Sequence, residues 1–470
     1  MPLFILHHQH DSERCPAQDP YMGSALLNHL SPASVHQHGV QIHAEAVVEG
    51  EHSLYLIVDA ADERRVRDFI KPFEACGSVN VYPASSCAKV VASGGCAAAP
   101  PRVDLLGPAA DPEKVCEDAI RTGLVVHRCH PLNGETSIPA LIGGAVMPNA
   151  KFYVRNHFQI PLLDPSRWRL AVRGLVERPL HLSLRDLQNL PSQSLVVTLE
   201  CAGNGRWRLD PPVDGEQWRL GAVSTAEWTG VPLIDVLDRA GVKTTAREVV
   251  LRGADGGTLV GRPELVQFER SLNLDQIRES QALLAYAMNG EPLPIQHGYP
   301  LRVVVPGWYG VTSVKWLTEI EVIDRVFDGY FHSERYFYEW QRDGQVLKEP
   351  VTLQRVRALI VEPRSEQVLA AGDFTIRGVA WSGAAPIARV EVSVGGGPWQ
   401  ESRLVGERKR YSWQWWELPA RAQSKGTVSI RARATDLAGR TQPERPEWNR
   451  LGYGNNGIQE IAVHLTQSNP

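Results

Sequence analysis

The chain has 470 residues, and 49 Lys and Arg against 53 Asp and Glu give it a formal net charge of −4. This length exceeds one ordinary hydrophobic core, so we expect about two to four domains. The near-neutral charge provides no global basic field, which argues against nucleic-acid binding and against attachment to an anionic membrane surface.

The N-terminal stretch MPLFILHHQHDSERC does not resemble a signal peptide, because its apolar run is short and no basic region precedes it. No later run approaches the length of a membrane span. The chain has 7 cysteines, an odd number, and their spacing shows no paired framework. We therefore predict a cytoplasmic protein with free or metal-ligating thiols.

Residues 1–98 form one predicted small unit with the order β-α-β-β-α-β, which is typical of a ferredoxin-like α/β sandwich. The expected elements are strands at 3–7, 40–48 and 52–59, helices at 24–30 and 62–75, and a closing strand for which 79–81 and 88–91 supply the residues.

This unit is also rich in histidine and cysteine, and imidazole and thiolate suit nickel, zinc or copper. The candidate ligands of a second metal site are His7, His43 and Cys87. No regular finger spacing supports them, so solvent-exposed histidines on a partner-binding or dimerising domain remain an alternative.

Residues 99–112 are rich in Pro and Ala and are interpreted as a linker. A mixed α+β domain is expected over 113–348, with an amphipathic helix at 231–240 and a buried strand at 301–305. Strands at 374–381, 387–394, 411–418, 427–436 and 458–465 then predict an immunoglobulin-like β-sandwich over 349–470. The whole chain is thus assigned to the α+β class.

The stretch LECAGNGRW at 199–207 follows an apolar strand predicted at 194–199. Ala202 and Gly203 carry almost no side chain, so a bulky group has room to approach the backbone there. From these residues alone, Cys201 is a core thiol, a nucleophile or a metal ligand, and a buried core thiol is the commonest case.

Three more stretches place polar or cationic groups in Gly-rich loops or beside strands. They are FYVRNH at 152–157, RGADGG at 252–257 and HGYPLRVVVPGWYGVTSVK at 297–315. Arginine, lysine, imidazole and backbone N–H groups suit phosphate and oxyanions. The pattern therefore indicates a site for a large anionic ligand.

Longer motifs resemble the sulfite oxidase family of molybdenum enzymes, which includes assimilatory nitrate reductase. They are PLNGETSIPALI at 131–142, PNAKFYVRNHFQIP at 148–161, TLECAGNGR at 198–206, GAVSTAEWTGVPLIDVL at 221–237, the stretch 286–322 and PEWNRLGYGNN at 446–456. The resemblance covers the middle and C-terminal domains and leaves out residues 1–98.

The resemblance implies a mononuclear molybdenum–molybdopterin cofactor with Cys201 as the protein ligand of the metal. A thiolate is a suitable soft ligand there. Substrate arginines then match Arg155, Arg206 and Arg450, the last lying one position from the family's arginine. The implied cofactor contacts are Arg155, His157, Asp255, His297, Arg302, Ser313, Val314 and Lys315.

Two departures from the family stand out. No haem signature occurs, so residues 1–98 are not expected to be a haem domain, and electrons are expected to pass directly to an external acceptor or to oxygen. The family often places a tyrosine near the metal in a stretch resembling WQRRDYK, whereas this chain has WQRDGQV at 340–346. Tyr336 and Tyr338 are close by, but in our alignment they are out of register.

The resemblance therefore predicts a cytoplasmic homodimer, paired through its C-terminal domain, that oxidises sulfite to sulfate. Reduction of nitrate or of a sulfoxide with the same cofactor is the enzymatic alternative. A metal-binding or metal-sensing role of residues 1–98 is the alternative from another class.

Overall fold

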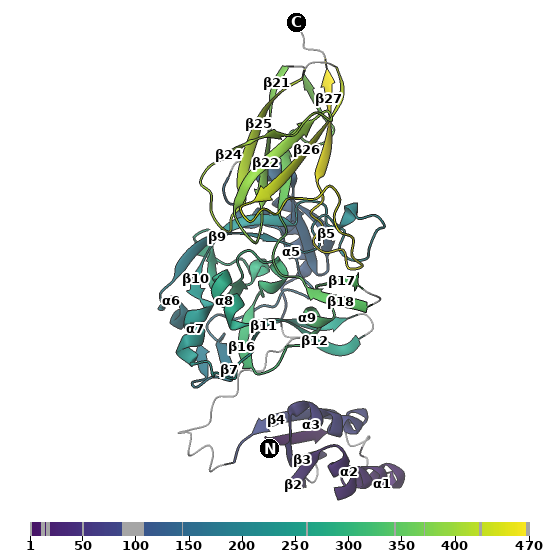
Figure 1. The fold of residues 1–470 in the computed structure, drawn as a ribbon. Helices are drawn as coiled ribbons and strands as arrows, with labels where there is room; N and C mark the ends of the chain where they lie inside the picture. The colour runs from purple at the N-terminus through teal and green to yellow at the C-terminus, as the bar shows by residue number, and fades with distance from the viewer. Residues whose placement is uncertain are drawn as a thin grey trace. The chain divides into compact units, whose positions relative to one another are not determined.

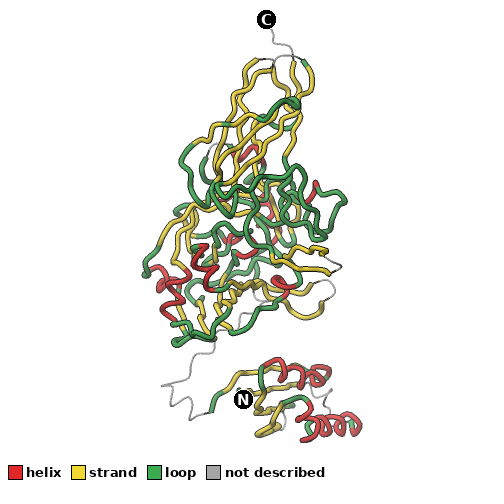
Figure 2. The backbone as a smooth tube through the Cα atoms, in the orientation of Figure 1, coloured by secondary structure: helices red, strands yellow, loops and turns green. Residues whose placement is uncertain are grey.

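The computed structural model describes residues 2–10, 15, 19–48, 51–86, 108–142, 144–259, 262–342, 345–370, 372–422 and 425–466. The chain divides into two compact units, Met1–Ala99 and Pro100–Pro470. Figure 1 labels their elements, and Figure 2 colours the backbone by secondary structure. No helix among the described residues is long and apolar enough to cross a membrane.

The N-terminal unit is a four-stranded antiparallel sheet with the strand order β2-β3-β1-β4. The elements are β1 (Leu3–Gln9), α1 (Pro20–His29), α2 (Pro32–Gln37), β2 (Val40–Val48), β3 (Ser53–Ala60), α3 (Glu63–Ile70), a 3₁₀ turn (Lys71–Ala75) and β4 (Ser78–Ala84). The strand predicted at 88–91 lies outside the described residues.

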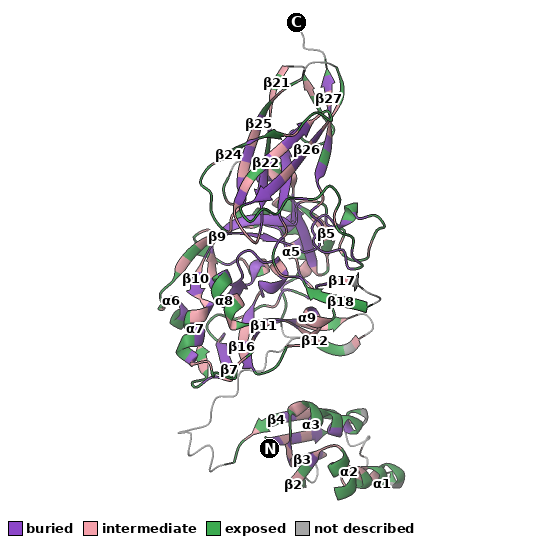
Figure 3. Cartoon of the chain, viewed as in Figure 1, coloured by how far each residue is buried: buried purple, intermediate pink, exposed green. Residues whose placement is uncertain are grey.

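Alternation of buried and more exposed side chains along the strands explains the core of this unit. Along β1, Phe4 and Leu6 are buried while their neighbours are more exposed, as a half-buried strand requires. Helix α3 buries Val66, Phe69 and Ile70 on one face, and its helical hydrogen bonding changes to a 3₁₀ turn at Lys71–Ala75, where Pro72 lies. In Figure 3 the outer helices α1 and α2 are mostly exposed.

The second unit begins with mixed strands and short helices. They are α5 (Pro112–Arg121), β5 (Leu124–Cys129), β6 (Leu132–Thr136), β7 (Leu170–Gly174), β8 (Leu180–Leu182), α6 (Leu184–Gln188), β9 (Gln193–Glu200), β10 (Val223–Pro232), α7 (Leu233–Ala240), β11 (Glu248–Leu259), β12 (Arg262–Leu272), α8 (Leu274–Ser280), β13 (Leu283–Met288), β14 (Glu291–Pro292), β15 (Arg302–Val304), β16 (Leu317–Ile323), α9 (Tyr330–Ser333), β17 (Phe337–Arg342) and β18 (Gln345–Pro350).

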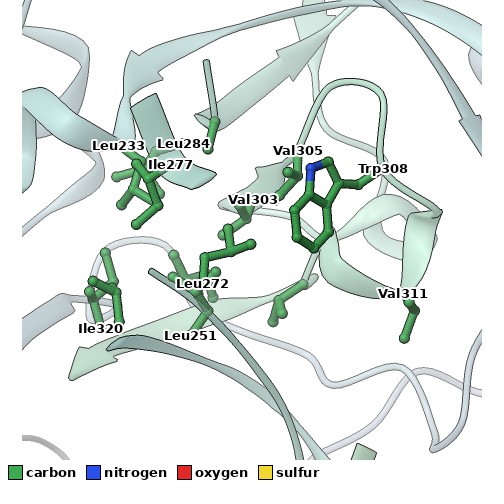
Figure 4. Close-up of a cluster of buried hydrophobic side chains, with 14 of the residues drawn as sticks. Leu233, Leu251, Leu272, Ile277, Leu284, Val303, Val305, Trp308, Val311 and Ile320 are labelled. Carbon is green, nitrogen blue, oxygen red and sulfur yellow. The ribbon is translucent and has the colours of Figure 1, made fainter. Parts of the chain in front are cut away.

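Two five-stranded sheets organise this part. One has the order β14-β13-β10-β9 with β15 against β13, and the other has the order β12-β11-β16-β7-β8. Figure 4 shows side chains from both, including Leu251, Leu284 and Ile320, in one buried cluster. Helix α7 adds Leu233 to this core, which confirms the amphipathic helix predicted at 231–240 apart from its first two residues.

The C-terminal part consists of two packed sheets, with the orders β19-β21-β25-β24 and β20-β27-β26-β22-β23. Its strands are β19 (Arg357–Glu362), β20 (Gln367–Ala370), β21 (Gly372–Trp381), β22 (Ile387–Val394), β23 (Gln400–Glu401), β24 (Arg403–Val405), β25 (Gln414–Ala422), β26 (Gly426–Asp436) and β27 (Gln459–Thr466). Ile376 of one sheet and Val390 of the other share a hydrophobic core.

The cysteines differ from the expectation of free or ligating thiols. Cys116 of α5 and Cys129 at the end of β5 form a disulfide bond with a Cα–Cα distance of 5.3 Å. Cys15, Cys76 and Cys201 are free among the described residues. The expectation of no paired cysteines was wrong because helix and strand fold back as a hairpin, which sequence spacing alone does not show.

Candidate active site

One pocket in the second unit gathers most of the predicted site residues. Its walls come from the loop after β9, from β11 and β15, and from the segments around 152–157 and 310–315. The lining residues are Phe152, Tyr153, Arg155, Asn156, His157, Leu199, Cys201, Ala202, Asp255, Phe268, His297, Arg302, Gly310, Val311, Ser313, Lys315 and Tyr336.

Cys201 stands directly after β9, where the strand ends and its loop begins. The backbone N–H of Cys201 donates to the carbonyl of Ala222 at 2.9 Å, which holds the loop against the neighbouring strand. A Cβ added at Gly203 would lie 2.6 Å from the guanidinium of Arg206, so glycine is required by a close approach. Burial raises the pKa of the Cys201 thiol, and the charge of Arg155 opposes that shift.

A buried ion pair stabilises the loop that follows β9. The Arg357 guanidinium, on β19, lies 3.0 Å from the Glu200 carboxylate, and both side chains are almost fully buried. The same carboxylate accepts hydrogen bonds from Asn204 at 3.0 Å and from the indole of Trp381 at 2.9 Å. Sequence reasoning missed Glu200 and Arg357 because their partners lie more than 150 residues away.

Cations gather at another wall of the pocket. Arg302 donates to the carbonyls of His297 and Ser313, each at 3.0 Å, and burial lowers its pKa to about 10. Lys315 donates to Asn156 Oδ1, and burial together with Arg302 lowers its pKa well below the usual range. These hydrogen bonds fix the two basic groups in place before any ligand arrives.

Asp255 lies at an irregularity of β11, where the pairing register with β12 shifts after Arg252. Such a bulge re-aims a side chain. Its Oδ1 is buried without a hydrogen-bond partner among the described residues, and burial raises the pKa of Asp255 to about 7. The unpaired oxygen is therefore available to accept a hydrogen bond from a ligand.

His297 belongs to the same wall, and its Nε2 lies 3.1 Å from the carbonyl of Asn149. Burial lowers the pKa of His297 to about 3, so the imidazole is neutral at neutral pH. Val314 is fully buried in the neighbouring core and does not line the pocket. Its carbonyl accepts from the backbone of Val303, so its contribution is to the loop's shape.

A tyrosine that the sequence alignment placed out of register lies in the pocket. The Tyr336 hydroxyl is 2.7 Å from Nε2 of His157, and its ring stacks on Tyr453 at 4.8 Å. Burial raises the pKa of Tyr336 and lowers that of His157 well below its usual range, so both groups are neutral. Tyr336 precedes β17 in a turn with a positive φ of 57°, which no local sequence pattern predicted.

The three predicted substrate arginines occupy different places. Arg155 lines the pocket. Arg206 is buried behind it, with its guanidinium held by the carbonyls of Glu216 and Leu451. Arg450 is 60% exposed and pairs with Glu339 at 2.6 Å, so its assignment to the pocket is corrected to a surface ion pair.

Two candidate ligands of the predicted second metal site, His7 and His43, have other partners. His7 stacks on Tyr55 with ring centroids 4.4 Å apart. His43 pairs with Asp59 at 2.9 Å. Cys87 lies outside the described residues. His7 and His43 are therefore engaged with other partners, since each strand of the sheet presents its histidine to a different neighbour.

Comparison with known proteins adds the following. The model of the oxidoreductase molybdopterin binding domain matches residues 157–331, and that of the Mo-co oxidoreductase dimerisation domain matches 349–466. The chain is 36% identical over 382 residues to the mitochondrial sulfite oxidase of Mus musculus, covering 76% of this chain and 68% of that protein. It is 33% identical over 374 residues to the sulfite oxidase of Arabidopsis thaliana, covering 74% of this chain and 95% of that protein.

A solved structure is also similar. The sulfane dehydrogenase SoxCD from Paracoccus pantotrophus superposes with a TM-score of 0.63 at 28% sequence identity. The match covers 71% of this chain and 85% of that one.

Proposed function

Because the chain belongs to the sulfite oxidase family of molybdopterin-dependent oxidoreductases, we propose that its pocket oxidises sulfite to sulfate. The chain is accordingly a molybdenum-dependent enzyme. The observation that supports sulfite as the substrate is that one pocket is lined by Cys201, Arg155 and Tyr336. A small dianion needs a cation and hydrogen-bond donors close to the reacting metal.

The residues present fit the cofactor. Cys201 supplies a sulfur ligand for the metal. The unpaired Oδ1 of Asp255 accepts a donor from a pterin, and the fixed cations Arg302 and Lys315 suit its phosphate. We assign the remaining contacts to His157, His297 and Ser313, which line the same pocket.

When bound, the cofactor supplies oxygen-atom transfer coupled to two-electron oxidation. The protein's part is positioning and charge. Arg155 lines the pocket, donates to Asn133 Oδ1 at 3.2 Å and is thereby oriented for an oxyanion. Its pKa stays high although burial opposes the charge, because Tyr336 and Cys201 favour the cationic form.

Tyr336 and His157 form a neutral hydrogen-bonded pair beside Arg155. The pair offers a proton at the tyrosine oxygen and a place to receive one at the imidazole, so it holds a proton near the developing charge. The Tyr336 hydroxyl in the pocket supports sulfite oxidation over reduction of nitrate or of a sulfoxide.

The test is sulfite-dependent reduction of ferricyanide by molybdenum-loaded full-length protein. Cys201→Ser is expected to abolish turnover, while Cys76→Ser, which changes a free cysteine in the N-terminal unit, is expected to leave it intact. Absence of sulfite turnover in wild-type protein with a full complement of molybdenum would refute the assignment.

Four further assignments accompany this proposal. Two chains pair through 349–466, the segment that matches a dimerisation model, and electrons leave to an external acceptor. The two packed C-terminal sheets are immunoglobulin-like, and the antiparallel order β2-β3-β1-β4 of the N-terminal unit is ferredoxin-like. Dimer formation is tested by the mass of the protein in solution.

Location remains a prediction. The sequence favours the cytoplasm, whereas the disulfide between Cys116 and Cys129 is typical of an oxidising compartment. Counting free thiols in protein isolated without reductant distinguishes the two, because a reducing compartment leaves both of these thiols titratable.

A further inference from the structure

Donor side chains of the N-terminal unit gather at one end of the β1–β3 strand pair. Gln9 at the end of β1 pairs with Ser53 at the start of β3, so His10 and His52 follow as neighbours. The backbone N–H of His10 donates to the carbonyl of His52 at 3.2 Å, and their ring centroids are 5.4 Å apart. The strand register therefore brings the two imidazoles together.

A thiol completes this group. One ligand atom from each of His10, Cys15 and His52 lies within 4.8 Å of the other two, and all three residues are partly buried. Ligand atoms at about 2.0–2.3 Å from a tetrahedral metal ion lie roughly 3.3–3.8 Å from one another. Small rotations of three side chains therefore bring their donor atoms onto one ion.

A third imidazole, that of His8, lines one pocket together with His10, Cys15 and His52. The ring of His8 lies 5.1 Å from that of His10, and its buried Nε2 has no hydrogen-bond partner among the described residues. The ring makes a hydrogen bond to the backbone of Phe73. An imidazole held by a backbone carbonyl at one nitrogen presents the other as a lone pair, which is how metal-ligating histidines are commonly oriented.

We propose that His10, Cys15 and His52 bind one zinc(II) or copper(I) ion, with His8 as the nearest further donor. Two imidazoles and a thiolate are ligands that both ions favour, whereas magnesium and calcium prefer oxygen. The site belongs to the N-terminal unit and is independent of the sulfite chemistry.

The first experiment is metal titration of the full-length, molybdenum-loaded protein after removal of other metals by a chelator. Zinc(II) and copper(I) are added separately, and calorimetry gives the affinity of each. One ion per chain is expected for at least one of the two. Cys15→Ser and His52→Ala are expected to weaken binding by about tenfold or more, since even outer-shell changes weaken metal sites that much.

Matched controls use residues of the same unit that lie outside the group. Cys76→Ser changes a free, partly buried cysteine, and His36→Ala changes an exposed histidine of α2. Both are expected to bind metal as the wild type does. Equal loss in controls and ligand variants would overturn the assignment, as would failure of both ions to bind.

A second measurement protects the test against variants that fold poorly. Cobalt(II) bound at the site in the wild type is expected to show a thiolate-to-metal charge-transfer band in the near ultraviolet. The band should persist in Cys76→Ser and disappear in Cys15→Ser at unchanged circular dichroism. A band that survives Cys15→Ser, or its absence from cobalt-loaded wild type, would overturn the role of the thiol.

Discussion

The hydroxyl of Tyr336 lies 2.7 Å from Nε2 of His157, and the two side chains come from segments 179 residues apart in the sequence. Both are kept neutral by burial, so the hydrogen bond joins an uncharged acid to an uncharged base. This pair lies in the pocket with Arg155, which makes its removal a direct test of the proposed chemistry.

Tyr336→Phe is expected to lower kcat for sulfite by about 10²-fold, the scale of a lost proton donor in the reacting pocket. Steady-state kinetics over a range of pH measures the effect. Tyr338→Phe, two residues along the chain and outside the pocket lining, serves as the control and should retain kcat. Equal rates in wild type and Tyr336→Phe would remove the hydroxyl from the mechanism.

Substitutions at Arg155 and Arg450 compare a cation that lines the pocket with a cation on the surface. Arg155→Gln is expected to lower kcat/KM for sulfite by about 10²–10³-fold, as loss of an oxyanion-binding group does in other enzymes. Arg450→Gln removes only an exposed ion pair with Glu339, worth about 1 kcal/mol or less. A larger kinetic loss in Arg450→Gln than in Arg155→Gln would restore the sequence-based assignment.

Glu200→Gln leaves the buried guanidinium of Arg357 without its counter-charge. The expected loss is about 3–5 kcal/mol in the free energy of unfolding, measured in urea. The control is Glu63→Gln, which breaks an exposed pair with Arg67 and should cost less than about 1 kcal/mol. A Glu200→Gln variant as stable as wild type would show that the pair does not support the fold.

The pH dependence of stability reports on His297 in cofactor-free protein. Its folded pKa of about 3 lies below the ordinary 6.5, so the unfolded chain binds a proton first as the pH falls. Stability is therefore full above pH 6.5 and declines below it, by about 3 kcal/mol at pH 4.5 from this group.

His297→Gln cannot take up that proton and is expected to lose correspondingly less stability between pH 7 and pH 4.5. Urea unfolding at both pH values gives the difference. Parallel losses in variant and wild type would mean that His297 is protonated in the folded protein.

Features that depend on residues close together in the sequence were predicted. The Cys201 loop, the Arg302–Lys315 cations and helix α7 each follow from a local pattern, and the structure has them where they were expected. Strands of the C-terminal part were anticipated through alternation at β21, β22 and β26. These patterns are local in the sequence, so a single sequence is sufficient to predict the corresponding elements.

Contacts between residues far apart in the sequence were not predicted. Tyr336 enters the pocket through a turn with positive φ, Arg357 reaches Glu200 from another sheet, and Cys116 meets Cys129 across a helix-to-strand reversal. The histidines of the N-terminal unit illustrate the same limit, because counting them did not show which ones the strand register brings together. The strand register places His10 and His52 together at one end of the β1–β3 pair.

The Glu200 carboxylate bears on the order in which the chain folds. It holds the Cys201 loop, and two of its three partners, Arg357 and Trp381, are supplied by the last part of the chain to leave the ribosome. The loop therefore acquires its final support only after the C-terminal sheets have formed. A chain ending before residue 349 would contain every residue that lines the pocket and still lack two of the three groups that bind this carboxylate.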